Sequence, residues 1–219
     1  MKRIALALAA LTFFTGCAML QPDQTVVLSP RITELDHDSF AILPFVDERS
    51  GKKDNFGFIV SDVVTDAFET AFMKSGHKIV ERSRVEKVLG EMRFSYSGDV
   101  DENQLKEIGK MTNANVVILG MVRDFKKATY ERVKGKMKTV TCTTLSYSVK
   151  AVHIQTGEVL WKGSITRSSG MKGDMFSPCD CNGIRFADRT SKSLVKKILA
   201  KTDAALKTKS EEYDMFPSQ

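Results

Sequence analysis

The sequence predicts an α/β fold: a single domain in which helices pack on one mixed β-sheet. Three observations lead to this prediction. Residues 115–122 form a continuous apolar run, which is typical of a central strand covered on both faces. Residues 56–72 place apolar side chains three and four positions apart, as an amphipathic helix does. Residues 145–151 alternate apolar and polar side chains, which indicates a strand with one solvated face.

The first part of the folded region is predicted to alternate strands and helices. Residues 40–46 are a short apolar run containing Pro44, so we expect a buried strand followed by a charged loop over residues 47–54. The amphipathic helix should stop at Ser75-Gly76, because glycine commonly ends helices. Residues 77–81 should then form a second short strand.

Two further helices are predicted before the central strand. Ser83 and Glu86 have the spacing of a capping box, which marks the start of a short helix. Asp101 can cap the next one. The apolar residues expected on their buried sides are Val85, Val88, Leu89 and Met92 in the first helix, and Leu105, Ile108 and Met111 in the second.

The second half of the chain changes character. The strand over residues 145–151 should return through a turn at Thr156-Gly157 into a partner that begins at residues 159–161. Residues 168–183 contain Gly, Ser and Cys and lead to a final helix with a solvated lysine face. The predicted order is β-α-β-α-α-β-β-β-α, in one domain over residues 40–209 with a polar tail over 210–219.

The N-terminus has the organisation of a secretory signal. Lys2 and Arg3 precede an apolar stretch over residues 4–14, which is shorter than the roughly 20 residues of a membrane-spanning helix. Residues 14–17 read Phe-Thr-Gly-Cys and resemble the lipoprotein signal, in which an aliphatic residue, a small residue and Gly or Ala precede the cysteine. Phe14 stands where leucine is usual. The alternative is an ordinary secretory signal with a chance cysteine.

The lipoprotein resemblance has several implications. It implies export through the general secretory route and removal of a signal peptide over residues 1–16. It also implies a diacylglycerol on the Cys17 thiol and an acyl chain such as palmitate on the freed amine, so that the lipid bilayer is a partner. Ala18, rather than Asp, follows the cysteine, which by the enterobacterial sorting rule implies the periplasmic face of the outer membrane. Residues 17–39 should be the lipidated N-terminus and a short flexible tether.

Charge and cysteine content narrow the expected partners. The chain has 33 basic and 27 acidic side chains, a mild excess that fits an acidic partner or simple solubility. We expect no nucleic-acid partner, because an exported lipoprotein rarely meets one.

In an oxidising compartment Cys142 could pair with Cys179 or Cys181, although free thiols are an open alternative. No metal site is expected, because Cys179 and Cys181 lack zinc-knuckle spacing and no histidine lies nearby.

Several segments between residues 40 and 207 share a pattern with one known family. The most specific of them is the run over residues 80–89. The others are residues 41–45, Ser61-Asp62, Gly98 before residues 105–109, residues 114–120 and the hairpin at residues 156–161. Together these segments resemble the CsgG family of curli-secretion lipoproteins. Related domains occur in LpoB, a peptidoglycan-synthase activator, and in the amino-terminal domain of TolB.

The CsgG resemblance implies a non-catalytic role in envelope or secretion-system assembly. A periplasmic protein partner or self-association is expected, with no cofactor and no small-molecule substrate. The residues themselves do not suggest an enzyme, because no glycine loop has phosphate-binding spacing and the histidines are scattered along the chain. Glu81, Arg82 and Arg84 fit cap and surface roles better than catalysis. The three histidines are His37, His77 and His153.

Three alternatives to this role stay open. An oligomeric secretion pore would insert hairpins from the connections over residues 126–144 and 166–186. The first connection alternates cations on one side, as a pore lumen requires, but its other side is a poor lipid-facing surface, so a non-pore protein is preferred. The alternating cations are Arg132, Lys134, Lys136 and Lys138. An LpoB-like activator of a peptidoglycan synthase would need a longer tether. An accessory protein of a flagellar or other envelope machine would need no such reach.

Overall fold

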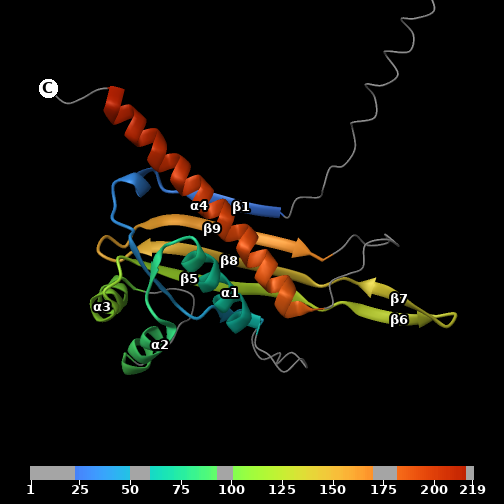
Figure 1. Cartoon of the computed structure of the whole chain (residues 1–219). Coiled ribbons are helices and arrows are strands. Elements are labelled where there is room, and N and C mark those ends of the chain that lie inside the picture. Colours follow the sequence, from blue (N-terminus) through green and yellow to red (C-terminus); the bar gives the residue numbers. More distant parts are fainter. Residues whose placement is uncertain (1–22, 50–59, 93–100, 170–181, 216–219) are drawn as a thin grey trace, which may run out of the picture.

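A seven-stranded mixed sheet forms the centre of the protein (Figure 1). The computed structural model describes residues 23–49, 60–92, 101–169 and 182–215. The strand order is β1-β9-β8-β5-β2-β4, and β3 also pairs with β5. The strands are β1 (Asp23–Leu28), β2 (Ser39–Ile42), β3 (Val46–Asp47), β4 (Lys78–Ile79), β5 (Val116–Lys126), β8 (Thr144–His153) and β9 (Val159–Ser168).

The predicted fold class is confirmed: one mixed sheet carries four α-helices among the described residues. Strands β2, β3 and β4 belong to the parallel part of the sheet, whereas β8, β9 and β1 are antiparallel. A separate two-stranded sheet is formed by β6 (Thr129–Val133) and β7 (Lys136–Thr141). The helices are α1 (Val60–Lys74), α2 (Arg82–Glu91), α3 (Glu102–Thr112) and α4 (Gly183–Met215), with a 3-10 turn η1 (Pro30–Thr33).

Helices α1 and α4 cover one face of the sheet (Figure 1). The apolar side of α1 buries Phe68 and Phe72, whose ring centroids lie 5.1 Å apart. Leu194 and Ile198 of α4 join the same cluster. As predicted, α1 stops at Ser75-Gly76, where Gly76 has φ 84°, a left-handed conformation that glycine adopts without steric cost. The predicted start of this helix, including Phe56 and Ile59, lies outside the described residues.

Helices α2 and α3 cover part of the opposite face through a second core cluster that includes Leu43, Val117 and Leu119. Asp101 caps α3 as predicted and forms a capping box with Gln104. The predicted capping role of Ser83 is wrong. Helix α2 begins two residues earlier than a Ser83 cap requires, at Arg82, so its N-cap is Glu81, which makes no side-chain capping hydrogen bond.

Strand β1 corrects the predicted tether. Residues 23–28 were expected to be flexible, but they pair with β9 along their whole length, and Val26 is only 4% exposed. Lys197 and Lys201 of α4 donate hydrogen bonds to the main-chain carbonyls of Gln24 and Val26. The edge of β9 and the lysine side chains of α4 together make this short segment a strand, so the folded domain begins before residue 40.

The predicted polar tail also differs from the structure. Helix α4 runs through Met215 and extends beyond the sheet (Figure 1). This extension is consistent with the sequence, because no Gly or Pro interrupts residues 184–215 and Pro217 follows them. Among the described residues, no helix combines the length and the apolar character needed to cross a bilayer.

Candidate interaction surface

Part of the sheet has none of the described helices over it. Helices α2 and α3 reach β2, the start of β5 and the adjoining ends of β8 and β9, and they leave the same side of β1 and of the rest of β9, β8 and β5 uncovered. We call this surface the open face. It encloses a shallow concavity of about 400 Å³. The side chains that characterise it are Thr25 and Val27, Met121 and Arg123, Ser148 and Lys150, and Lys162 and Ser164.

Strand register arranges these side chains in two rows across the open face. One row contains two cations and consists of Val27, Lys162, Lys150 and Leu119. The next row contains hydroxyl groups and consists of Thr25, Ser164, Ser148 and Met121. Lys150 and Lys162 are therefore direct cross-strand neighbours, an arrangement in which like charges repel. The row pattern follows from the alternation that the sequence showed in β8.

A β-bulge places the third cation of the open face. The register between β5 and β8 shifts between Val122 and Asp124, so Arg123 is the extra residue. The bulge lets both Val122 and Phe125 point into the core while Arg123 is exposed. No ion pair or hydrogen bond joins the guanidinium of Arg123, or the ammonium of Lys162, to another residue in the described ranges.

The chemistry of the open face suits the binding of an acidic surface. Among the described residues its lining contains cations, hydroxyls and a few apolar side chains, but no carboxylate and no histidine. The three cations give the surface a positive potential that favours an acidic partner.

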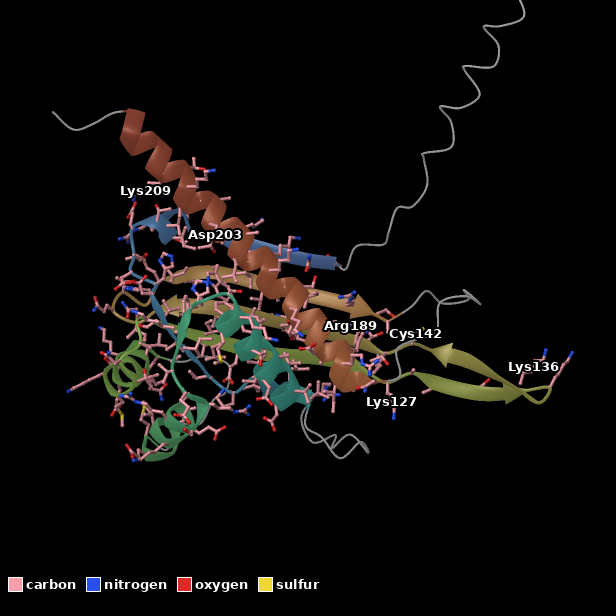
Figure 2. All side chains as sticks on the ribbon, viewed as in Figure 1. Lys127, Lys136, Cys142, Arg189, Asp203 and Lys209 are labelled. Carbon is pink, nitrogen blue, oxygen red and sulfur yellow. The ribbon has the colours of Figure 1, made fainter. Side chains whose placement is uncertain are left out.

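The cysteine predictions fall mostly outside the described residues. Cys17, Cys179 and Cys181 all lie there. Cys142 lies just before β8, is half-buried and is disulfide-bonded. Figure 2 shows it at the base of the β6–β7 hairpin. Its pairing with Cys179 or Cys181 stays a prediction.

The first connection named for a possible pore forms the β6–β7 hairpin, which projects from one end of the sheet (Figure 1). Lys134 and Gly135 connect its strands with φ values of 50° and 77°. Two successive positive φ angles are typical of the tight type I′ turn. Lys136 lies at the far end of the hairpin (Figure 2). The second connection, over residues 166–186, lies largely outside the described residues.

The residues Arg82 and Arg84 have the surface roles predicted for them. Arg82 joins α2 to α1 through ion pairs with Asp62 at 3.3 Å and with Asp66, and it also pairs with Glu86 at 2.8 Å. Arg84 donates to the main-chain carbonyl of Met111. Arg82 therefore joins α2 to α1, and Arg84 joins α2 to α3, so both side chains have structural roles at the surface.

Glu69 is a perturbed group that the sequence analysis missed. Burial raises its pKa to about 7, with a further increase from Asp66 and Glu86 that Arg82 opposes. Its Oε1 atom is buried and has no hydrogen-bond partner in the part of the chain that the structure describes. The sequence does contain an indication of this acidic cluster. Asp62, Asp66 and Glu69 are four and three residues apart, so they share one face of the helix.

The histidines are scattered in sequence but gather near one end of the sheet, opposite the hairpin. His77 packs against the rings of Phe40 and Phe72 at 5.4 and 5.5 Å. His153 lies 3.0 Å from the Thr156 hydroxyl through Nδ1. Burial is the main reason that the pKa of His77 and that of His153 are lowered, and the charge of His37 contributes to both. The described residues contain no group of three or more potential metal ligands.

Comparison with known proteins gives one sequence family and several structural neighbours. The family model "Curli production assembly/transport component CsgG" matches residues 47–172. No curated protein matches the chain. The PelC dodecamer structure from Paraburkholderia phytofirmans is 13% identical, with 82% of this chain and 96% of that chain covered and a TM-score of 0.43.

Two further solved structures are similar in the same range. Lipoprotein GNA1162 from Neisseria meningitidis is 15% identical, with 64% of this chain and 86% of that chain covered and a TM-score of 0.46. The LpoB C-terminal domain from Escherichia coli is 13% identical, with 64% of this chain and 93% of that chain covered and a TM-score of 0.40.

Proposed function

The chain belongs to the CsgG family, and from this premise we propose that it is a periplasmic lipoprotein that acts without catalysis in envelope or secretion-system assembly. In this proposal Cys17 carries the acyl groups that anchor the protein in the outer membrane. The matched residues 47–172 contain β5, β8 and β9, which are three of the four strands of the open face.

The observation that carries the proposal is the open face itself. Lys150 and Lys162 lie opposite each other there, and Arg123 is lifted onto the same surface by a bulge. An acidic surface of a periplasmic protein, or of a second copy, would neutralise these charges on docking. Complementary potentials of this kind steer association and select partners. The hydroxyl row beside them offers hydrogen bonds to the same partner.

The position of β1 supports a site of action close to the anchoring membrane. Cys17 precedes Asp23 by six residues, which span at most about 20 Å when fully extended. The alternative role as activator of an inner-membrane peptidoglycan synthase needs reach across the periplasm. A six-residue span does not provide it.

The lipid anchor and the open face can be tested separately. Cells that produce the Cys17→Ala chain should lose fatty-acid labelling and membrane fractionation of this protein. A labelled, membrane-bound Cys17→Ala chain would contradict the anchor. For the open face, Lys150→Glu with Lys162→Glu should abolish chemical cross-links to the partner in cells. Lys196→Glu, an exposed charge change on α4, is the control. Equal cross-linking in both variants would contradict the assignment of the surface.

A second candidate function is an oligomeric secretion pore, and the projecting β6–β7 hairpin is the observation that favours it. A pore requires closed rings of uniform size, whereas docking on a partner permits a monomer. Mass photometry of detergent-extracted lipidated protein separates these two states. Uniform rings that also conduct ions in planar bilayers would establish the pore and replace our first proposal.

A further inference from the structure

The start of β1 and the base of the β6–β7 hairpin lie at the same end of the sheet. Asp23 is the register partner of Thr166, and Thr166 pairs with Ser146 near the start of β8. At this end Lys126, the last residue of β5, pairs with Thr144. Figure 1 shows β1 beginning on the side from which the hairpin projects. We call this side the hairpin end.

Helix α4 also begins at the hairpin end. Ser193 and Lys197 hydrogen-bond to Gln24 near the start of β1, whereas Lys209 reaches Thr33 at the other end of the molecule. The third and fourth turns of α4 therefore lie beside the start of β1, and the first two turns continue toward the base of the hairpin, where Figure 2 shows Arg189. These first two turns expose Ile184, which is 51% accessible to solvent, and the side chains of Arg185 and Arg189.

The distance that the N-terminal segment can span is similar to the length by which the hairpin projects from the sheet. The six residue-to-residue steps from Cys17 to Asp23 span at most about 20 Å. The seven steps from Lys127 to Lys134 project by about 23 Å at the usual rise of a strand. A bilayer that holds an acyl group on Cys17 can therefore be no farther from the sheet than the tip of the hairpin.

The hairpin end is strongly basic. Its exposed acids in the described ranges are Asp23, Glu48 and Glu131, and Asp124, whose side chain is 39% exposed, forms an ion pair with Lys126 at 3.2 Å. At the tip, Lys134 and Lys136 are exposed, and neither side chain pairs with any described residue. The exposed cations of this end are Arg123, Lys126, Lys127, Lys134, Lys136, Arg185 and Arg189.

We propose that the hairpin end lies on the surface of the anchoring membrane, with Lys134 and Lys136 in contact with the phosphate groups of anionic phospholipids. The inference rests on the proposed lipid anchor at Cys17. It sets the orientation of the domain: the hairpin touches the bilayer, and the open face stands at an angle to it where a protein partner can reach. Acylation and a basic patch are the two signals that together hold a protein stably on a membrane.

Cross-linking in reconstituted membranes tests this orientation. A benzophenone amino acid replaces Lys136 in the lipidated full-length chain, which is reconstituted into vesicles of phosphatidylethanolamine and phosphatidylglycerol. Lys110 of α3, exposed at the opposite end, is the matched control position. We expect phospholipid adducts from position 136 and none from position 110. Protein that floats with the vesicles but gives no lipid adduct from position 136 overturns the orientation while leaving the anchor intact.

The contribution of charge is measured on the full chain with Cys17→Ala, which has no acyl group to hold it. Each basic residue near an anionic surface contributes about 1 kcal/mol, or roughly a fivefold change in binding. Lys134→Gln with Lys136→Gln should therefore weaken binding to phosphatidylglycerol vesicles by about 25-fold, while Lys78→Gln with Lys110→Gln leaves it unchanged. Equal loss in both pairs overturns the proposal. So does position 136 cross-linking to a second copy or to peptidoglycan instead of lipid.

Discussion

Lys150 of β8 and Lys162 of β9 are register partners on the open face of the sheet. Like charges placed directly opposite each other on antiparallel strands destabilise the sheet by a few tenths of a kcal/mol to about 1 kcal/mol. The described lining of the concavity contains no carboxylate. An acidic partner that docks on this face would relieve the repulsion between the two lysines.

Lys162→Glu should turn this repulsive pair into an attractive one. We expect the free energy of unfolding to rise by about 0.5 kcal/mol at low salt, measured by urea denaturation. The gain should shrink as salt screens the pair. Lys196→Glu makes the same charge change on α4 and should show no comparable gain. A loss of stability in Lys162→Glu would mean that Lys162 has a stabilising role that the open face does not explain.

Phe68→Ala should remove the centre of the α1 packing. Phe68 is 0% exposed, and its ring lies 5.1 Å from that of Phe72 and 5.5 Å from that of Phe45. Truncating a buried phenylalanine costs about 3 to 5 kcal/mol, because transfer energy is lost and a cavity is left. Met73→Ala, on the exposed side of the same helix, should change stability by less than about 0.5 kcal/mol. Similar melting curves for both variants would show that this helix face is not core.

Gly120→Ala should destabilise the central strand through a steric clash. The ring of Phe45 occupies the space in which a Cβ atom on residue 120 would lie. Phe45 packs in turn against Phe68 and Tyr147, so its ring cannot move without disturbing the core. We expect a loss of about 1 to 3 kcal/mol by urea denaturation. Gly90→Ala in α2 meets no neighbouring atom and should instead stabilise by about 0.5 kcal/mol. A neutral Gly120→Ala would contradict the close packing.

The sequence was enough to predict those elements whose buried side chains or caps depend only on neighbouring residues. Residues 116–122 are apolar throughout and became the central strand, and the Asp101 cap follows from hydrogen bonds within one helical turn. Strand β1 could not be predicted in this way. It buries Val26 against α4, and that contact depends on lysines about 170 positions later in the chain. Ser83 is not the cap because the helix starts two residues earlier than predicted, a difference that helix propensity does not resolve.

The open face was only half visible in the sequence. The alternation of Ser146, Ser148 and Lys150 correctly indicated a solvated side of β8. Which strands stand beside β8, and in what register, is decided by long-range pairing. The bulge at Arg123 leaves no sequence signal, because β5 reads as an ordinary strand there.

Glu69→Gln should change how stability depends on pH. The pKa of Glu69 is raised to about 7 in the folded protein, so folding favours its protonated form. Its contribution to stability is fully present below pH 4.5 and is lost as the pH rises through 7. Since the side chain is partly exposed, screening reduces the effect, and we expect Glu69→Gln to be about 1 kcal/mol more stable than the parent at pH 8.

Urea denaturation at pH 5 and pH 8 measures this difference. At pH 5 the parent and Glu69→Gln should have nearly the same midpoint, because Glu69 is then protonated in the folded state. Glu107→Gln, an exposed charge change on α3, is the control and should not reproduce the pattern. A Glu69→Gln advantage of equal size at both pH values would exclude titration of Glu69 as its cause.

Cys142 should bond to Cys179 or Cys181 and thereby fix the segment after β9 to the base of the hairpin. Cys142 precedes β8, whereas both candidates follow β9, its antiparallel neighbour. Closing a loop of this length stabilises by about 3 to 4 kcal/mol in the chain-entropy model. Reductant should therefore lower the unfolding midpoint of the parent, and it should have no further effect on Cys142→Ala. Peptide mapping without reduction identifies the partner, and recovery of all three cysteines as alkylated thiols would contradict the bond.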